Sequence, residues 1–194
     1  MNKKIRTIAL GGVLAGLTFL LGLTPIGIIP LGPANVTLMC LPVIIGTLTV
    51  STPMGVLLGG VFGITSVIRA FTAPSALVTP LMGVSPLLVI IMSVASRLIF
   101  PAVAGLVYKG VSAGGTKREK RALILSSAAG SLANTVSYLG LMLLFYALCG
   151  LDSAAVLGVI AGVGALNGSL EAVAAVLICV PVVLAVKKSG PKKK

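Results

Sequence analysis

Six long apolar stretches alternate with short polar or turn-rich breaks along this 194-residue chain. The breaks are marked by Pro, Gly, Ser or charged residues, which typically separate one helix from the next. Each stretch is long enough for an α-helix to cross the hydrocarbon core of a bilayer. We therefore expect an all-α, multi-pass membrane protein that forms one transmembrane domain over residues 1–194, with spans at about residues 7–23, 34–50, 54–71, 85–108, 122–148 and 154–186.

The composition points to the same class. Hydrophobic residues make up 57% of the chain and charged residues 9%, with a mean hydropathy of +1.17. Soluble domains carry roughly 25% charged residues. A large soluble domain is therefore excluded.

The positive charges give the expected orientation. Of the 15 Lys and Arg residues, 13 lie in three groups, at residues 3–6, 109–121 and 187–194. Because cytoplasmic segments of membrane proteins are enriched in Lys and Arg, we expect both termini and the 109–121 loop in the cytoplasm of a cell-membrane protein. The net charge of +12 then reflects topology, and we expect no nucleic-acid partner.

Two of the predicted spans contain features that disturb a simple helix. Arg97 lies in the middle of residues 85–108, one turn before Pro101, and a charged residue and a proline both disfavour a continuous helix facing lipid. We expect an irregular outer half there, followed by a short inner helix. Residues 156–186 exceed one crossing, and Asn167–Gly168 is the expected break, with a short outer helix before it.

The chain has few residues that could support catalysis. It has no His, no CxxC pair, no GxSxG motif and no closely spaced carboxylates. Cys40, Cys149 and Cys179 are isolated, which favours apolar packing. Without a GxxxxGK[ST] loop the chain cannot use ATP by itself. We expect no enzyme activity, no catalytic residue, no metal and no cofactor.

A sparse set of polar residues in the apolar frame forms the candidate binding site. Ionisable residues at membrane depth usually face a cavity or one another. Arg97 could bind an anionic group of a ligand or pair with Glu171, and Glu171 could carry a proton or sodium ion. The asparagines could join helices or bind ligand amides and hydroxyls, and Arg69 could snorkel to the interface. The candidates are Asn35, Thr37, Arg69, Arg97, Asn134, Asn167 and Glu171.

The first span carries small residues at a spacing of four. Gly11 precedes Ala15, and Gly12 precedes Gly16. Such pairs form a flat strip that another helix can approach closely. The strip could serve docking of a partner or packing within the chain.

Four segments together carry a resemblance to a known family. They are TIALGGVLAGLTFLLGL at the start, IPLGPANVTLMCLPVIIGTL followed by STPMG, GGVFGITS, and SPLLVIIMSVASRLIFPAVAGLVYKG. From about residue 3 to 188 the chain resembles the substrate-specific S component of an energy-coupling factor (ECF) vitamin transporter. The pattern PLGxxNxTLMxxPVIIG is most similar to the branch that holds pantothenate and folate components.

The resemblance implies a six-helix bundle with a vitamin pocket near its outer face. It also implies that the strip on the first helix docks on a transmembrane scaffold subunit, which two cytoplasmic ATPases drive. The family often has Pro where this chain has Ser96, and Ala where Gly dominates the strip. Pantothenate suits the polar residues, since Arg97 can bind its carboxylate. The alternatives are folate, a self-sufficient carrier or channel working through Glu171, and a structural subunit without a ligand.

Overall fold

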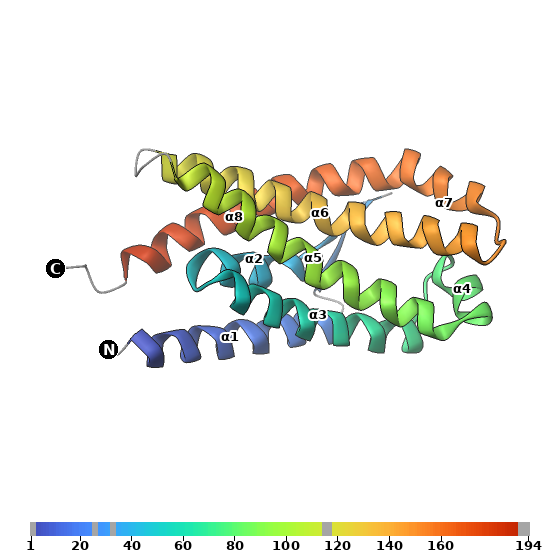
Figure 1. Ribbon diagram of the computed structural model, residues 1–194, viewed down its shortest axis with the longest axis horizontal. Coiled ribbons are helices and arrows are strands. Elements are labelled where there is room, and N and C mark those ends of the chain that lie inside the picture. Colours follow the sequence, from blue (N-terminus) through green and yellow to red (C-terminus); the bar gives the residue numbers. More distant parts are fainter. Residues whose placement is uncertain (1–2, 25–26, 32–33, 114–117, 190–194) are drawn as a thin grey trace.

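The computed structural model describes residues 3–24, 27–31, 34–113 and 118–189. Over these ranges the chain forms a helical bundle with one short hairpin (Figure 1). In chain order the elements are α1 (Lys3–Leu23), β1 (Ile28–Leu31), β2 (Ala34–Thr37), α2 (Cys40–Thr49), α3 (Thr52–Thr72), α4 (Val78–Val84), α5 (Pro86–Ser112), α6 (Glu119–Leu148), α7 (Ser153–Val159), a π-helical segment (Ile160–Gly164) and α8 (Ala165–Lys188).

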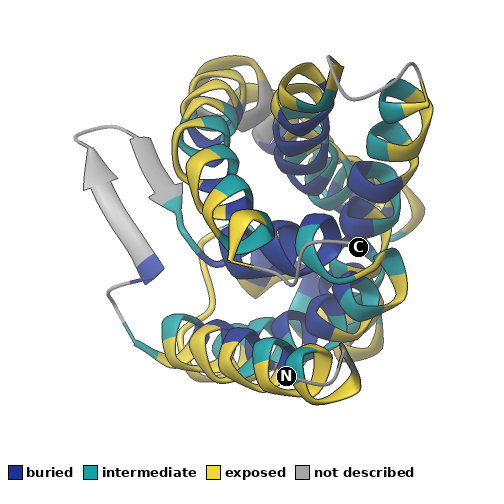
Figure 2. Ribbon diagram, turned by 90° about the vertical axis from the view of Figure 1, so that its left-hand side faces the viewer, coloured by how far each residue is buried: buried dark blue, intermediate teal, exposed yellow. Residues whose placement is uncertain are grey.

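Five of the described helices, α1, α3, α5, α6 and α8, are long and apolar enough to cross a membrane. Their outward faces are exposed and the faces turned into the bundle are buried (Figure 2), and many of the exposed residues are large hydrophobics. Ile8, Val136 and Leu177, for example, are 72%, 68% and 68% exposed. Apolar surface on this scale marks contact with lipid. The prediction of a helical membrane protein is confirmed, with five of its six spans.

The second predicted span, residues 34–50, is only partly helical. Its first residues form β2, which pairs antiparallel with β1 so that Ile28 lies opposite Thr37. The prediction of a helix there is wrong. The helix that follows, α2, has ten residues and a length of about 15 Å, roughly half the thickness of the hydrocarbon core. Because Cys40 to Leu48 are all buried, other helices rather than lipid surround α2.

α5 runs without interruption from Pro86 to Ser112, so the expected irregular half and short inner helix are wrong. The nitrogen of Pro101 carries no proton, which leaves the carbonyl of Arg97 without its helical donor. Gly59 of α3 packs against that carbonyl, since a Cβ at Gly59 would lie only 2.2 Å from the Arg97 oxygen. Close packing by a neighbouring helix is one way in which membrane proteins accommodate a proline.

The long last segment divides slightly earlier than predicted. α7 is the short helix expected before residue 167, but the change in geometry lies at Ile160–Gly164. Asn167 and Gly168 therefore lie in the first turn of α8 rather than at the break. A π-helical turn inside a helix often marks a functional site.

α1 begins and α8 ends at the same end of the bundle, opposite α4 (Figure 1), and we call this the terminal end. Polar contacts join the helix ends there. Lys187 Nζ lies 2.9 Å from Glu119 Oε1 and donates to the Tyr108 hydroxyl at 2.5 Å. Arg6 Nη2 donates to the Val186 carbonyl at 2.5 Å. These contacts connect α1, α5, α6 and α8 at the terminal end.

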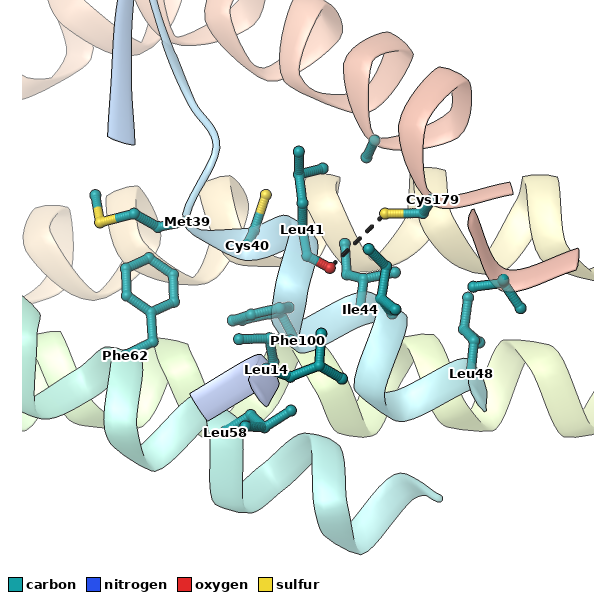
Figure 3. Close-up of a cluster of buried hydrophobic side chains, with 14 of the residues drawn as sticks. Leu14, Met39, Cys40, Leu41, Ile44, Leu48, Leu58, Phe62, Phe100 and Cys179 are labelled. Atoms are coloured by element: carbon teal, nitrogen blue, oxygen red, sulfur yellow. Dashed lines mark hydrogen bonds between the residues drawn. The ribbon is translucent and has the colours of Figure 1, made fainter. Parts of the chain in front are cut away.

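Two hydrophobic clusters fill the bundle. The first surrounds α2 and includes Leu14, Ile44 and Phe100 (Figure 3). Cys40 and Cys179 lie in it as free thiols, as the sequence predicts. The second cluster lies at the end away from the termini and consists of Val78, Leu81, Val89, Met92, Met142, Phe145, Tyr146 and Val156.

Candidate functional site

A cavity of about 450 Å³ lies between the two hydrophobic clusters. Met39 of the first cluster and Val78 of the second both line it. Its other walls come from the last turns of α3, the first half of α5, the middle of α6, the start of α8 and the end of β2. These segments place the cavity in the half of the bundle away from the termini (Figure 1).

Six of the seven predicted binding residues line this one cavity: Thr37, Arg69, Arg97, Asn134, Asn167 and Glu171. Helical spacing explains part of the convergence, because Asn167 and Glu171 are four residues apart on α8 and share a face. Folding brings these residues to Arg69 of α3 and Arg97 of α5. The seventh residue, Asn35, lies in β2, and its side chain falls outside the described part of the structure.

Arg97 is held in a defined orientation. Its guanidinium lies over the rings of Phe62 and Tyr138, at 4.8 and 4.6 Å from the ring centroids. Its Nη1 donates to Ser96 Oγ at 2.7 Å. That hydroxyl in turn donates to the Met92 carbonyl at 2.8 Å. Ser96 therefore positions the arginine.

Glu171 is engaged by hydroxyl and amide groups. Its Oε1 accepts from the backbone N–H of Thr37 at 2.9 Å and from the Thr37 hydroxyl at 2.5 Å. Its Oε2 accepts from the Thr135 hydroxyl at 3.2 Å. The carboxylate thus fastens the end of β2 to α8 and α6.

The ion pair of Arg97 with Glu171, one interpretation of the sequence, is not formed. The salt bridge found in the described part of the chain joins Lys187 and Glu119. Arg97 and Glu171 nevertheless line the same cavity. With Arg69 they give the cavity two positive charges and one negative charge, so the cavity as a whole favours an anion.

Four buried polar atoms in the cavity walls lack a hydrogen-bond partner: Arg69 Nη1, Arg97 Nε, Asn134 Oδ1 and Asn167 Oδ1. Leaving a buried polar group unpaired costs about 1–3 kcal/mol, and more for a charged group. Native proteins contain few such atoms, and each calls for an explanation. Two guanidinium donors and two amide groups that surround one cavity can together bind a polar, anionic small molecule.

Sequence reasoning missed several residues of this site. Tyr138, Thr135, Ser66 and Ser93 also line the cavity. Tyr138 follows Asn134 by four residues on α6, and this spacing could have placed it on the same face. Nothing in the sequence alone indicates that Thr135 bonds Glu171, because that contact depends on how α6 packs against α8.

The small residues of α1 divide between two faces. Gly11 is buried, and a Cβ there would lie 2.9 Å from Met54 Cε of α3. Ala15 packs against the first cluster. Gly12 and Gly16 are exposed, with no other atom within 4 Å of a Cβ added at either position. One pair therefore serves packing within the chain, and the other lies open on the surface.

A family model described as ECF transporter, substrate-specific component, matches residues 6–183. That range includes every residue that lines the cavity and both small-residue pairs of α1. No curated protein matches the chain.

Proposed function

Because the chain belongs to the substrate-specific component family of ECF transporters, we propose that it captures a small carboxylate vitamin, with pantothenate favoured, in the cavity between its two hydrophobic clusters. Members of this family are membrane transport subunits rather than enzymes. They bind a substrate and associate with a scaffold subunit and ATPases. The ligand and the residues that bind it are our proposal.

The observation that carries the proposal is the set of four unpartnered polar atoms around one cavity. Arg97 is already oriented by Ser96, Phe62 and Tyr138. Little ordering is therefore needed when a carboxylate binds it, and preorganisation of this kind raises affinity. Asn134 and Asn167 can bind amide and hydroxyl groups of the ligand. The apolar wall formed by Met39, Val78 and Leu139 suits a methyl-bearing group.

The size and lining of the cavity favour pantothenate over folate. A volume of about 450 Å³ lies near the lower end of the range of roughly 300–1,000 Å³ for small-molecule sites. Tyr138 is the aromatic residue among the described residues that line it, and its ring is occupied by Arg97. A pterin ring would call for more aromatic surface than this cavity provides.

Transport requires partners in this proposal. The exposed pair Gly12 and Gly16 is the surface proposed to dock on the transmembrane scaffold subunit, which two cytoplasmic ATPases drive. Both termini would then lie in the cytoplasm, and the cavity would lie in the half of the bundle nearer the outer face. This arrangement is supported by the start of α1 and the end of α8, which lie at the same end of the bundle (Figure 1).

A self-sufficient carrier or channel is the alternative function. It would use Glu171 as a proton or sodium site. The three hydrogen bonds that Glu171 accepts argue against this role, because they hold the carboxylate in a structural contact. Gradient-driven uptake into liposomes by the purified chain, without ATPases, would support the carrier.

A thermal-shift screen of the purified protein against the water-soluble vitamins tests the proposal. A ligand that binds only the folded state stabilises that state, by about 2.7 kcal/mol at one hundred times its Kd. Such a ligand must therefore raise the melting temperature. We expect pantothenate to give the largest rise and the Arg97→Ala variant to lose it. If no vitamin shifts the melting temperature, the chain is a structural subunit and the proposal fails.

A further inference from the structure

A second recess adjoins the cavity. It is a groove of about 420 Å³ between α6 and the start of α8. Hydrophobic side chains of α6 form one wall, among them Leu132, Val136 and Leu139. Small residues form the other side, including Gly164 and Gly168. The groove starts where the π-helical segment ends at Gly164, so the local widening of that helix lies next to it.

The cavity and the groove share part of their walls. Thr135, Leu139 and Gly164 line both. The Thr135 hydroxyl donates to Glu171 on the cavity side. Its methyl group is directed at α8, since a Cβ added at Gly168 would lie 3.4 Å from Thr135 Cγ2. The two recesses therefore adjoin each other at these shared residues.

The two recesses differ in chemistry. The four unpartnered polar atoms that line a recess all belong to the cavity. The groove is lined mainly by Leu, Val, Ala and Gly, and Thr135 and Ser169 are its hydroxyl residues. The Ser169 hydroxyl already donates to the Ala165 carbonyl at 2.8 Å. The groove thus offers an apolar surface directly beside a cationic, hydrogen-bonding one.

We propose that the cavity and the groove form one site for an amphipathic carboxylate. The carboxylate and its polar neighbours bind Arg97, Arg69 and the two asparagines, and an unbranched or lightly substituted apolar arm passes Thr135 and Leu139 into the groove. This inference rests on the proposed function and narrows its substrate class. The short gem-dimethyl end of pantothenate would occupy only the entrance of the groove.

The wall that the groove shares with the polar cavity is the reason to assign the groove to the ligand. Val136 and Leu166 beside it are 68% and 59% exposed, so a lipid acyl chain is the competing occupant. A lipid chain would fill the groove whether or not the cavity is occupied. A ligand arm would couple the two recesses, and this coupling can be measured.

The test uses N-acyl-β-alanines, which place a carboxylate at one end and an unbranched acyl chain at the other. With chains of roughly two to ten carbons, we expect affinity for the native protein to rise by about threefold to fourfold for each methylene that becomes buried, and to level off when the groove is full. Binding is measured by calorimetry in one detergent and repeated in lipid nanodiscs.

The matched variants are Gly140→Leu and Gly60→Leu. Neither glycine has an atom within 4 Å of an added Cβ, and both lie inside long helices. Gly140 lines the groove and Gly60 does not line either recess. Gly140→Leu should bind the shortest acid as the native protein does and lose the gain from chain length. Gly60→Leu should retain that gain.

The outcomes separate the two proposals. If the short acids bind but affinity does not rise with chain length, the groove belongs to lipid, and this inference is wrong while the proposed function stands. If affinity rises with chain length equally in the native protein and in Gly140→Leu, this inference is also wrong, because the acyl arm then binds outside the groove. If neither pantothenate nor any acid of the series binds, the proposed function and this inference both fail.

Discussion

Gly59 of α3 lies against the backbone carbonyl of Arg97 on α5, close enough that a Cβ at Gly59 would come within 2.2 Å of the oxygen and 3.3 Å of Pro101 Cγ. The carbonyl is the one that Pro101 deprives of its helical donor. The backbone of the principal cationic residue is therefore fixed by a helix contact that only glycine permits.

We predict that Gly59→Ala lowers both stability and ligand affinity. The added methyl group must push α3 away from α5, and overpacking of this kind typically costs 1–3 kcal/mol. Gly60→Ala is the matched control, because nothing lies within 4 Å of its Cβ and alanine favours the helix by up to about 1 kcal/mol. Melting temperatures of the two variants, with and without pantothenate, check this. Equal melting temperatures would contradict the packing described here.

We predict that Arg97→Ala weakens binding of the carboxylate by roughly thirty-fold or more. Truncating one member of a desolvated charge pair typically costs about 2–5 kcal/mol, and each 1.4 kcal/mol is tenfold. Arg97→Lys should recover part of the affinity, because lysine keeps the charge but lacks the guanidinium fork. Calorimetric titration of the three proteins gives the comparison.

A ligand analogue with its carboxylate reduced to an alcohol completes a double-mutant cycle with Arg97→Ala. The native protein should bind the alcohol weakly, and the variant should lose little further affinity for it. If Arg97→Ala weakens acid and alcohol equally, the arginine does not contact the carboxylate. Its role would then be the structural one of holding Phe62 and Tyr138.

We predict that Glu171→Ala loosens the hairpin while leaving the terminal end of the bundle intact. Its loss removes the acceptor of the Thr37 amide and hydroxyl, and hydrogen bonds to charged groups contribute about 1.5–3 kcal/mol. Hydrogen exchange of the Thr37 amide should accelerate. Glu119→Ala is the control, since it breaks the salt bridge to Lys187 at the other end. Unchanged exchange at Thr37 in Glu171→Ala would rule out this anchoring role.

We predict that Gly12→Leu or Gly16→Leu abolishes ATP-dependent uptake by the assembled transporter but leaves ligand binding nearly intact. Both positions are open on the surface of α1, so a larger side chain blocks close approach of a partner helix. Gly11→Leu is the contrasting variant, because it collides with Met54 and should destabilise the subunit itself. Equal loss of binding and uptake in Gly12→Leu would assign this pair to internal packing.

We predict that a cysteine introduced at residue 112 or 113 is labelled from the cytoplasmic side. The prediction follows from the 13 of 15 cations that lie at the termini and in the 109–121 loop. A membrane-impermeant thiol reagent added to intact cells, and then to permeabilised cells, makes the measurement. Labelling in intact cells would reverse the proposed orientation.

The sequence predicts the long helices well because their length and hydropathy are local properties. Five spans lie where the apolar stretches indicate, and the STP turn before α3 is capped by the Ser51 hydroxyl, which accepts from the Met54 amide at 3.3 Å. The sparse polar residues were also informative. In an apolar bundle each of them needs a cavity or a partner, and six of the seven candidates share one cavity.

The remaining features depend on contacts between helices. Pro101 predicts a broken helix when α5 is considered alone, whereas Gly59 supports the carbonyl that the proline leaves free. Residues 34–37 belong to a stretch whose hydropathy predicts a span, but they form a strand, which Glu171 holds from 134 residues away. The positions of Thr135 and Tyr138 in the site likewise depend on packing that no local pattern encodes.

The enclosure of α2 has a consequence for how the protein enters the membrane. Ten residues reach about halfway across the hydrocarbon core, so the bilayer alone cannot hold this segment in place during synthesis. α2 becomes stable at its depth only when α1, α3, α5 and α8, which contribute Leu14, Leu58, Phe100 and Cys179 to the cluster around it, have been inserted. Because α8 follows α2 in the chain and completes the shell around it, α2 reaches its packed position only after α8 has been inserted.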